Sequence, residues 1–162
     1  MPARFPRGAR SKGQRLRLRD YSPSDFNALF ELDQQCFVEG IAYSRAELRR
    51  YIDRKGAFVI VAEGAAGKIA GFLVGLHHRD YGWIVTIDVR DSARRTGLGT
   101  QLMAAAEKRF RGLKAGAVIL EVAVNNIPAV NFYKRLGYSV IRTIPRYYLD
   151  SLDAFQMAKL LD

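Results

Sequence analysis

The stretch DVRDSARRTGLGTQLM, residues 88–103, places two arginines and two glycines between an apolar segment and an amphipathic one. The preceding residues 83–89, WIVTIDV, are rich in β-branched side chains, which is typical of a buried strand. After the glycines, apolar residues recur at every fourth position, as expected for one face of a helix: Leu98, Leu102, Ala106 and Phe110. The helical pattern ends within residues 112–116, and AVILEVAVN, residues 117–125, resumes as a strand. The sequence therefore predicts a strand, glycine loop, helix, strand unit.

The glycine loop of this unit is suited to binding an anion. Backbone N–H groups at the first turn of a helix have no partner inside the helix, and the helix dipole places partial positive charge there. A phosphate satisfies both conditions at once. Gly97 and Gly99 let the backbone approach such a group closely, and Arg94 and Arg95 add positive charge. The loop is therefore predicted to hold a phosphate-bearing ligand.

Two common phosphate-binding motifs do not match the loop. A P-loop requires Gly-Lys-Ser/Thr after its second glycine, whereas Gly99 is followed by Thr100 and Gln101. A dinucleotide fingerprint requires a third glycine where Leu102 stands, although Glu121 lies near the distance expected of a ribose-binding acid. Nucleoside triphosphates and dinucleotides are thus disfavoured.

Length and composition favour a single domain. A chain of 162 residues with 49% apolar content is large enough to bury one core. The longest apolar run, Ala57–Ala62, is about six residues, far short of a membrane span, so we expect a soluble, cytoplasmic protein. Cys36 is the one cysteine, which excludes a disulfide framework. His77 and His78 are adjacent and would point to opposite sides of an extended segment, so no metal site is expected.

The net charge of +10 is concentrated at the start of the chain. Residues 1–19 contain no acid and carry seven basic side chains: Arg4, Arg7, Arg10, Lys12, Arg15, Arg17 and Arg19. We expect residues 1–14 to form a solvated basic tail and residues 15–162 to form the domain. The tail either contacts RNA or ribosomes without sequence specificity or has no partner.

The segments before the glycine loop are predicted as a strand, two helices and a hairpin. Alternation predicts a strand at residues 15–21. Ser22 and Asp25 then have the spacing of a capping box, in which each side chain accepts from the backbone N–H of the other residue at the start of a helix. Ser44 and Glu47 repeat that spacing at a second helix. Two further strands, AFVIVAEG and KIAGFLVGL, are joined by the turn GAAG. The loop between the helices contains apolar side chains that either seal the core or line a substrate groove: Phe37, Val38, Ile41 and Tyr43.

The pattern Arg94-x-x-Gly97-x-Gly99 between a strand and a helix resembles the coenzyme A loop of the GNAT N-acetyltransferase superfamily. The resemblance continues through LEVAVNNIPAVNFYKRLGY and the closing RYYLDSLDAFQMAKL, and so covers nearly the whole chain after the tail. Within the superfamily the chain is most similar to ribosomal-protein alanine N-acetyltransferases and related enzymes that acetylate protein N-termini. The resemblance implies an α/β (α+β) fold with a mixed, mostly antiparallel sheet of six or seven strands, a βαβ coenzyme-binding unit and helices on both faces.

The resemblance also implies roles for individual residues. The strand end would present its backbone to the acetyl and pantetheine part of acetyl-CoA, through Ile87, Asp88 and Val89. The loop would hold the pyrophosphate, through Arg94, Arg95, Thr96, Gly97, Leu98, Gly99 and Thr100. Asn126 matches a coenzyme-contacting asparagine, Glu121 the proton acceptor and Tyr133 the proton donor. The acceptor would be bound by Phe37, Val38, Tyr43, Tyr147 and Tyr148.

Each of these residues also has a structural interpretation. Strand alternation places Glu121 on the face opposite Leu120, where it either meets solvent or acts in a site. Asn126 is suited to cap the helix that begins before Pro128, and this is compatible with a coenzyme contact. Tyr133 lies on the apolar stripe of that helix and is either a core residue or a proton donor. Tyr147 and Tyr148 are consecutive, so in a regular strand at most one would line a groove.

The function predicted from the resemblance is direct transfer of acetyl from acetyl-CoA to an amine. At pH 7, removing the proton of an α-amine costs about 1 kcal/mol, whereas a lysine costs about 4–5 kcal/mol. The N-terminal α-amine of a protein, with ribosomal proteins as one candidate class, is therefore the favoured acceptor. A lysine or a small-molecule amine is the alternative acceptor, and a non-catalytic RNA or ribosome-associated module is the alternative function. No metal is required, and the sequence assigns no oligomeric state.

Overall fold

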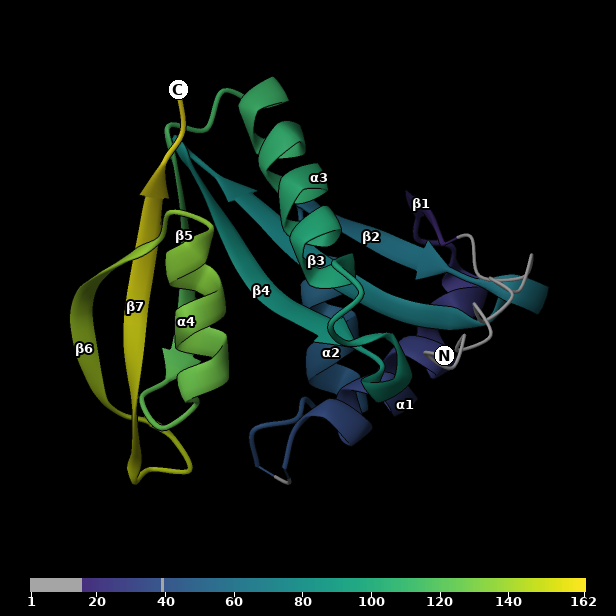
Figure 1. Cartoon of the computed structure of the whole chain (residues 1–162), viewed down its shortest axis with the longest axis horizontal. Helices are drawn as coiled ribbons and strands as arrows, with labels where there is room; N and C mark the ends of the chain where they lie inside the picture. The colour runs from purple at the N-terminus through teal and green to yellow at the C-terminus, as the bar shows by residue number, and fades with distance from the viewer. Residues whose placement is uncertain (1–15, 39) are drawn as a thin grey trace, which may run out of the picture.

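The computed structural model describes residues 16–38 and 40–162, and the basic tail predicted at residues 1–14 lies outside these ranges. The described chain folds into one seven-stranded sheet flanked by four α-helices (Figure 1). The strands are β1 (Arg17–Asp20), β2 (Ala57–Glu63), β3 (Ile69–His78), β4 (Tyr81–Val89), β5 (Ala117–Ala123), β6 (Ser139–Tyr148) and β7 (Leu152–Leu160). The helices are α1 (Phe26–Cys36), α2 (Arg45–Ile52), α3 (Leu98–Gly112) and α4 (Ile127–Arg135).

The strand order is β1-β2-β3-β4-β5-β7-β6, and all neighbours are antiparallel except β4 and β5. The parallel pair is connected through α3, which confirms the predicted strand, glycine loop, helix, strand unit. A mixed, mostly antiparallel sheet with helices on both faces is likewise confirmed.

The pairing of β4 with β5 is short. It extends only over Tyr81–Trp83 on β4 and Ala117–Ile119 on β5, although both strands continue beyond it. The register between β3 and β4 shifts between Ile84 and Thr86, which is the signature of a bulge. Because a bulge bends and twists its strand, β4 turns away from β5, and the two strands separate along the rest of their lengths (Figure 1).

Two apolar layers hold the helices to the sheet. One contains α3 and α4, where the predicted stripe Leu98, Leu102, Ala106 and Phe110 is fully buried. The other contains α1 and α2 and is centred on Phe72 of β3. Gly82 allows α3 to approach β4 closely, since an added Cβ would lie 2.5 Å from a ring atom of Phe110. The close approach of α3 to the backbone of β4 therefore fixes the position of α3 and of the glycine loop at its N-terminus.

The helix boundaries follow the predicted capping signals. The backbone N–H of Ser22 donates to the Asp25 carboxylate at 2.8 Å, and the hydroxyl of Ser44 accepts from the N–H of Glu47 at 3.1 Å. The start of the first helix differs from the prediction, because Pro23–Asp25 forms a separate 3₁₀ turn and α1 begins only after it. At the end of α4, Gly137 has a φ of +96°, the left-handed conformation that stops a helix.

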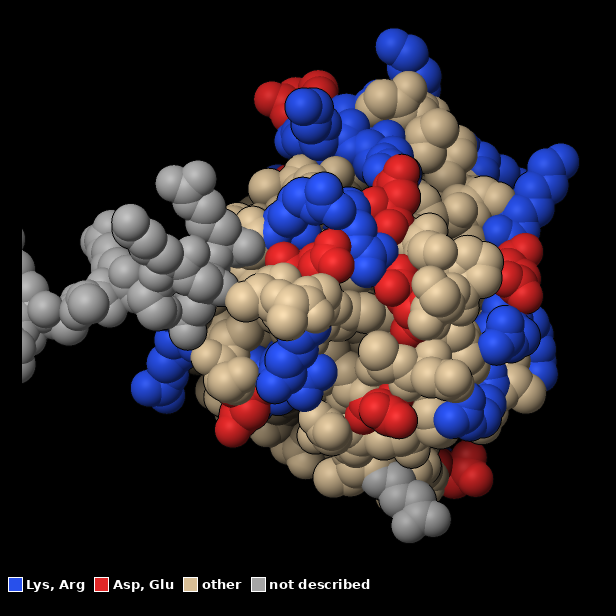
Figure 2. Space-filling model, turned by 90° about the vertical axis from the view of Figure 1, so that its right-hand side faces the viewer, with Lys and Arg blue, Asp and Glu red and all other residues tan. Residues whose placement is uncertain are grey.

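On the face shown in Figure 2, basic and acidic side chains are interspersed rather than gathered by sign. Within the described ranges, no helix is long and apolar enough to cross a membrane. The same ranges contain no cluster of three or more His, Cys, Asp or Glu side chains placed to hold a metal ion.

Asp25 connects α1 to the first strand through a two-point ion pair. Its two carboxylate oxygens accept from the guanidinium of Arg19 at 2.8 and 2.9 Å, and Arg19 also donates to Glu63 at 2.9 Å. The Arg19 hydrogen bonds, opposed by burial and helped by the N–H of Ser22, hold the pKa of Asp25 below its usual value. Asp25 is therefore a charged group that stabilises the folded state.

Replacing Asp25 by Asn should lower the free energy of unfolding at pH 7 by about 1–2 kcal/mol, because a charge-assisted pair is lost. Since folding lowers this pKa, the stabilisation is present above the unfolded-state value of about 3.9 and is lost as the pH falls through the folded value. Urea denaturation at pH 7 and at pH 3 measures both effects. The matched control is Asp20→Asn, whose exposed partner Arg109 contributes little. Equal losses of unfolding free energy in Asp25→Asn and Asp20→Asn would contradict the stabilising role assigned to Asp25.

Candidate active site

The end of β4 offers backbone donors that no strand uses. Arg90 N–H donates to the carbonyl of Ala70 on β3 at 2.7 Å. Because successive residues of a strand point their N–H groups to opposite edges, those of Ile87 and Val89 face away from β3. On that side the pairing with β5 has already ended. Of the predicted backbone contacts, the N–H groups of Ile87 and Val89 therefore lie at an open edge, whereas the N–H of Asp88 faces β3 and its side chain is buried.

The glycine loop leaves a continuous run of unpaired amides. The first hydrogen bond of α3 is donated by Gln101 to the carbonyl of Gly97 at 3.0 Å. Between Arg95 and Thr100, no backbone N–H donates to another described residue. Gly97 has a φ of +84°, and a Cβ built on it would meet no atom within 4 Å. The loop therefore combines free donors with open space above them, as a diphosphate requires.

The two glycines of the loop have different surroundings. Gly99 lies within the first turn of α3, where an added Cβ would come within 3.2 Å of the Phe132 ring on α4. Its small size thus serves the packing of α4 against α3, a role that the sequence analysis did not anticipate. Arg94 is paired with Asp91 at 3.4 Å and donates to the carbonyl of Val89 at 3.3 Å. Arg94 therefore ties the loop to the end of β4.

Glu121 is half-buried on β5, and both of its carboxylate oxygens accept a hydrogen bond. The indole N–H of Trp83 on β4 donates at 2.7 Å, and the amide of Gln156 on β7 donates at 3.1 Å. Arg142 on β6 donates in turn to Gln156 at 2.8 Å. Four neighbouring strands thus fix the orientation of one carboxylate, on the face of the sheet opposite Leu120.

Tyr133 and Asn126 occupy α4 in the positions that their structural interpretations predict. Tyr133 is buried at 8% exposure, and its hydroxyl makes no hydrogen bond to any described residue. Burial raises the pKa of this hydroxyl, so the phenol keeps its proton at neutral pH. The Asn126 side chain accepts from the N–H of Ala129 at 3.3 Å and so caps the helix. Its contact with the coenzyme stays a prediction.

Tyr147 and Tyr148 lie side by side, which differs from the alternation of a regular strand. The register between β6 and β7 shifts between Ile144 and Tyr148, and Arg146 has a φ of +51°. The two rings meet edge to face, with centroids 4.7 Å apart. Burial, and then the nearby charge of Glu121, raises the pKa of both hydroxyls. The bulge therefore brings the two rings into contact, where the alternation of a regular strand would separate them, and both hydroxyls lie within range of the charge of Glu121.

The loop between α1 and α2 lies against the same region. The Tyr43 hydroxyl donates to the carbonyl of Val85 at the β4 bulge, at 3.2 Å. A Cβ on Gly40 would overlap the side chain of Leu149 in the turn between β6 and β7. Phe37 is half-buried, whereas Val38 is 63% exposed. The loop and the turn therefore meet, with apolar side chains around their junction.

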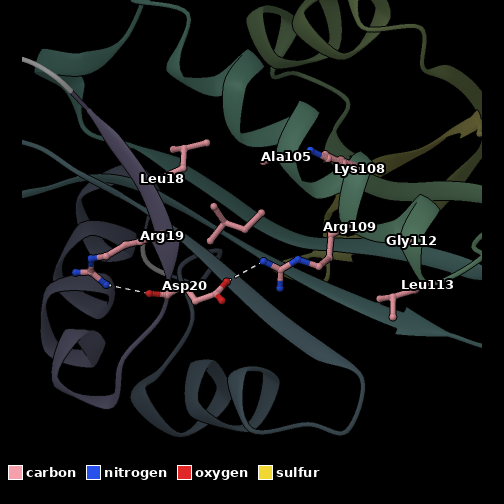
Figure 3. Close-up of a pocket in the computed structure, with 9 residues that line it drawn as sticks. Leu18, Arg19, Asp20, Ala105, Lys108, Arg109, Gly112 and Leu113 are labelled. Carbon is pink, nitrogen blue, oxygen red and sulfur yellow. Dashed lines mark hydrogen bonds and ion pairs between the residues drawn. The ribbon is translucent and has the colours of Figure 1, made fainter.

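A hollow of about 630 Å³ lies elsewhere, between β1 and the second half of α3 (Figure 3). It is lined by Leu18, Ile60 and Ala105 among others, and the ion pair between Arg109 and Asp20 at 2.8 Å crosses it. None of the predicted site residues lines it. The chemistry-bearing side chains gather instead where β4 separates from β5.

Sequence reasoning alone missed four residues of this region: Trp83, Gln156, Asp33 and the side chain of Asp88. The first two orient Glu121, and the last two form a buried pair beneath the strand end. Tryptophan occurs once in the chain, on the strand before the glycine loop, and that was an available signal. The contact of Gln156 with Glu121 depends on the pairing of β5 with β7, which no local pattern reveals.

Comparison with known proteins gives the same picture. Residues 26–138 match the family model described as Acetyltransferase (GNAT) family. An N-alpha-acetyltransferase of Sulfurisphaera tokodaii is 30% identical over 91% of this chain and 94% of its own length. The crystal structure of Ard1 from Thermoplasma volcanium aligns with a TM-score of 0.83 at 28% identity, covering 91% of this chain and 98% of that one. The ribosomal-protein-S18-alanine N-acetyltransferase from Escherichia coli shares the fold, with a TM-score of 0.81 at 20% identity over 91% and 95% of the two chains.

The family match spans well over half of the chain and includes the bulged strand, the glycine loop and the strand that carries Glu121. The chain therefore belongs to the acetyltransferase (GNAT) family and is an acetyl-CoA-dependent N-acetyltransferase.

Proposed function

We propose that the protein transfers acetyl from acetyl-CoA to the N-terminal α-amine of a protein. The observation that carries this proposal is the position of Tyr147 and Tyr148, whose rings pack edge to face and whose hydroxyls are both within range of the charge of Glu121. Paired aromatic side chains beside a carboxylate suit an acceptor that brings a polypeptide backbone along with its amine. The relative from Sulfurisphaera tokodaii, named an N-alpha-acetyltransferase, aligns along nearly its whole length and supports the same acceptor class.

The coenzyme is proposed to lie along the open edge of β4 and over the glycine loop. The free amides from Arg95 to Thr100 would hold the diphosphate, with Arg95 supplying exposed positive charge. The N–H of Val89 would face the thioester carbonyl, where a donor stabilises oxygen as it gains negative charge. When bound, acetyl-CoA supplies an acetyl group activated as a thioester.

Proton transfer is assigned to two side chains on separate elements. Glu121 on β5 would accept the proton of the acceptor amine, directly or through one water. Tyr133 on α4, which keeps its proton at neutral pH, would donate to the departing thiolate. Since an α-amine loses its proton at pH 7 for about 1 kcal/mol, one carboxylate is a sufficient base for this acceptor.

The acceptor is proposed to enter between the α1–α2 loop and the β6–β7 turn. These segments meet at Gly40 and Leu149, and the side chains exposed beside the junction include Val38, Tyr147 and Asp150. The apolar and aromatic side chains of this surface suit an acceptor that brings a polypeptide along with its amine. Glu39, the acid of the loop, lies outside the described residues.

The first test is acetylation of peptides that differ at positions 1 and 2, with ribosomal-protein N-termini among them. Peptides with a free α-amine should be acetylated at pH 7, and α-blocked peptides with a free lysine should react at least about 100-fold more slowly, because far less of the lysine is unprotonated. Mass spectrometry of the products identifies the acetylated nitrogen. Equal rates for the two peptide classes would reject the α-amine as the preferred acceptor.

Replacing Glu121 by Gln should lower turnover at pH 7 by about 100-fold or more, as expected when a general base is lost. The deficit should shrink above pH 8, because the α-amine, with a pKa of about 7.7–8.0, then loses its proton to water. Steady-state kinetics between pH 6 and pH 9.5 measure both effects. The control is Glu31→Gln on the exposed side of α1, which should match the wild type. A deficit that does not depend on pH would assign Glu121 a positioning role only.

Replacing Tyr133 by Phe should lower turnover by roughly 10- to 100-fold while acetyl-CoA affinity stays within about twofold, since only the proton donor is removed. The matched control is Tyr138→Phe. The Tyr138 hydroxyl donates to Glu107 at 2.9 Å, so this variant should lose about 1–2 kcal/mol of stability and keep its turnover. Kinetics, calorimetry and urea denaturation separate the two outcomes. Equal turnover in both variants would remove Tyr133 from the mechanism.

A further inference from the structure

Two carboxyl groups lie buried against each other between α1 and the end of β4. Asp33 is fully buried, and Asp88 is 1% exposed. The Thr86 hydroxyl donates to one oxygen of Asp88 at 2.6 Å, and the backbone N–H of Tyr43 donates to one oxygen of Asp33 at 2.8 Å. The other oxygen of each carboxyl is buried and receives no donor from the described residues. The two side chains are hydrogen-bonding neighbours of one another.

A single proton between the two carboxyl groups gives both unpaired oxygens a hydrogen-bond partner. Two ionised carboxylates in contact inside a protein repel each other, and each would lack a donor on one oxygen. If one carboxyl is protonated, its O–H donates to the other, and every buried oxygen then has a partner. Burial, and then the hydrogen bond and charge of Asp33, raises the pKa of Asp88 well above its ordinary value, which identifies Asp88 as the donor. Asp33, which accepts from Asp88 and Tyr43, is the carboxylate of the pair.

The position of the pair connects the two halves of the active site. Asp88 belongs to the strand end whose neighbour, Val89, turns its N–H toward the separation of β4 and β5. Asp33 lies near the end of α1 and holds the backbone of Tyr43, the last residue of the loop before the Ser44 cap. The side-chain amide of Gln34 on α1 donates to the Tyr43 carbonyl at 2.8 Å, so a second hydrogen bond joins α1 to this loop.

We propose that Asp33 and Asp88 share one proton and act as positioning residues, holding the acceptor loop in a fixed relation to the strand end that receives the acetyl group. This coupling to acceptor binding rests on the proposed function. The shared proton itself does not, because it follows from the buried geometry.

The groups that face the pair do not titrate in the same range. Tyr43 lies on the loop, Cys36 on α1 and Tyr133 on α4, and burial raises the pKa of all three, so they stay neutral through pH 8. Arg94, in the loop before α3, is the cation that faces Cys36. A dependence on pH between about 5 and 8 at this place can therefore be assigned to the two carboxyls.

The first experiment replaces Asp88 by Asn, which provides a permanent donor to Asp33 and needs no proton. The wild type must retain a proton that the unfolded chain releases above about pH 4, so its stability falls as the pH rises toward the folded pKa. The melting temperature of Asp88→Asn should therefore exceed that of the wild type by an amount that grows with pH, reaching at least about 3 °C at pH 8. Asp33→Asn should behave in the same way, because either position can carry the donor.

The matched control is Asp25→Asn, another buried aspartate, whose pKa is lowered by Arg19. Its effect has the opposite sign, because the variant is less stable than the wild type, and the deficit stays constant above about pH 5, where Asp25 is ionised in the folded and the unfolded state. Infrared difference spectra of the full-length protein at pH 7 provide a direct readout. The wild type should show the band of a protonated carboxyl, and Asp88→Asn should lack it. A flat melting difference together with no such band would overturn the shared proton.

The positioning role is tested by separating acceptor binding from coenzyme binding. Asp33→Leu leaves the Tyr43 N–H without its acceptor and should raise the KM for an N-terminal peptide about tenfold, while the Kd for acetyl-CoA stays within about twofold. Asp33→Asn retains that acceptor and should restore the KM. Equal changes in both constants, or no rescue by Asn, would overturn the positioning role. If the wild type acetylates no α-amine, the proposed function fails. The melting and infrared results would still show whether Asp33 and Asp88 share a proton.

Discussion

The short parallel pairing of β4 with β5 is the constraint on which the rest of the structure depends. Hydrogen bonds join the strands only as far as Trp83 and Ile119, and the bulge near Val85 then turns β4 away. In a fully paired sheet, the N–H of Val89 would be used by β5 and no donor would be left for a substrate. Incomplete pairing therefore leaves free backbone donors at the end of β4, inside the sheet rather than at its border.

Keeping two strands apart requires support from both faces of the sheet. On one face, α3 is drawn close to β4 through Gly82 and holds the glycine loop at the strand end. On the other, α1 contacts the same strand end through Asp33 and Asp88, and Tyr43 bonds to the bulge itself. Glu121 is fixed separately by Trp83 and Gln156. The groups proposed to react thus lie on elements that are each anchored, as expected of a preorganised site.

The sequence was sufficient for the local features and insufficient for the long-range ones. Capping at Ser22 and Ser44, the apolar stripe of α3 and the left-handed stop at Gly137 all depend on neighbours within a few residues, and all were predictable. The partners of Glu121 were not, because they come from strands joined by long connections. Glu107 shows the same limit, because it is buried by partners that lie far from α3 along the chain, Lys159 and Tyr138.

The bulge near the end of β6 has a second consequence, for solubility. This strand forms one border of the sheet, and a border with a regular row of free amides and carbonyls can recruit a strand from another molecule. Pro145 lacks an amide hydrogen, and the positive φ of Arg146 interrupts the extended backbone. The same irregularity that brings Tyr147 and Tyr148 together therefore also protects the molecule against edge-to-edge aggregation.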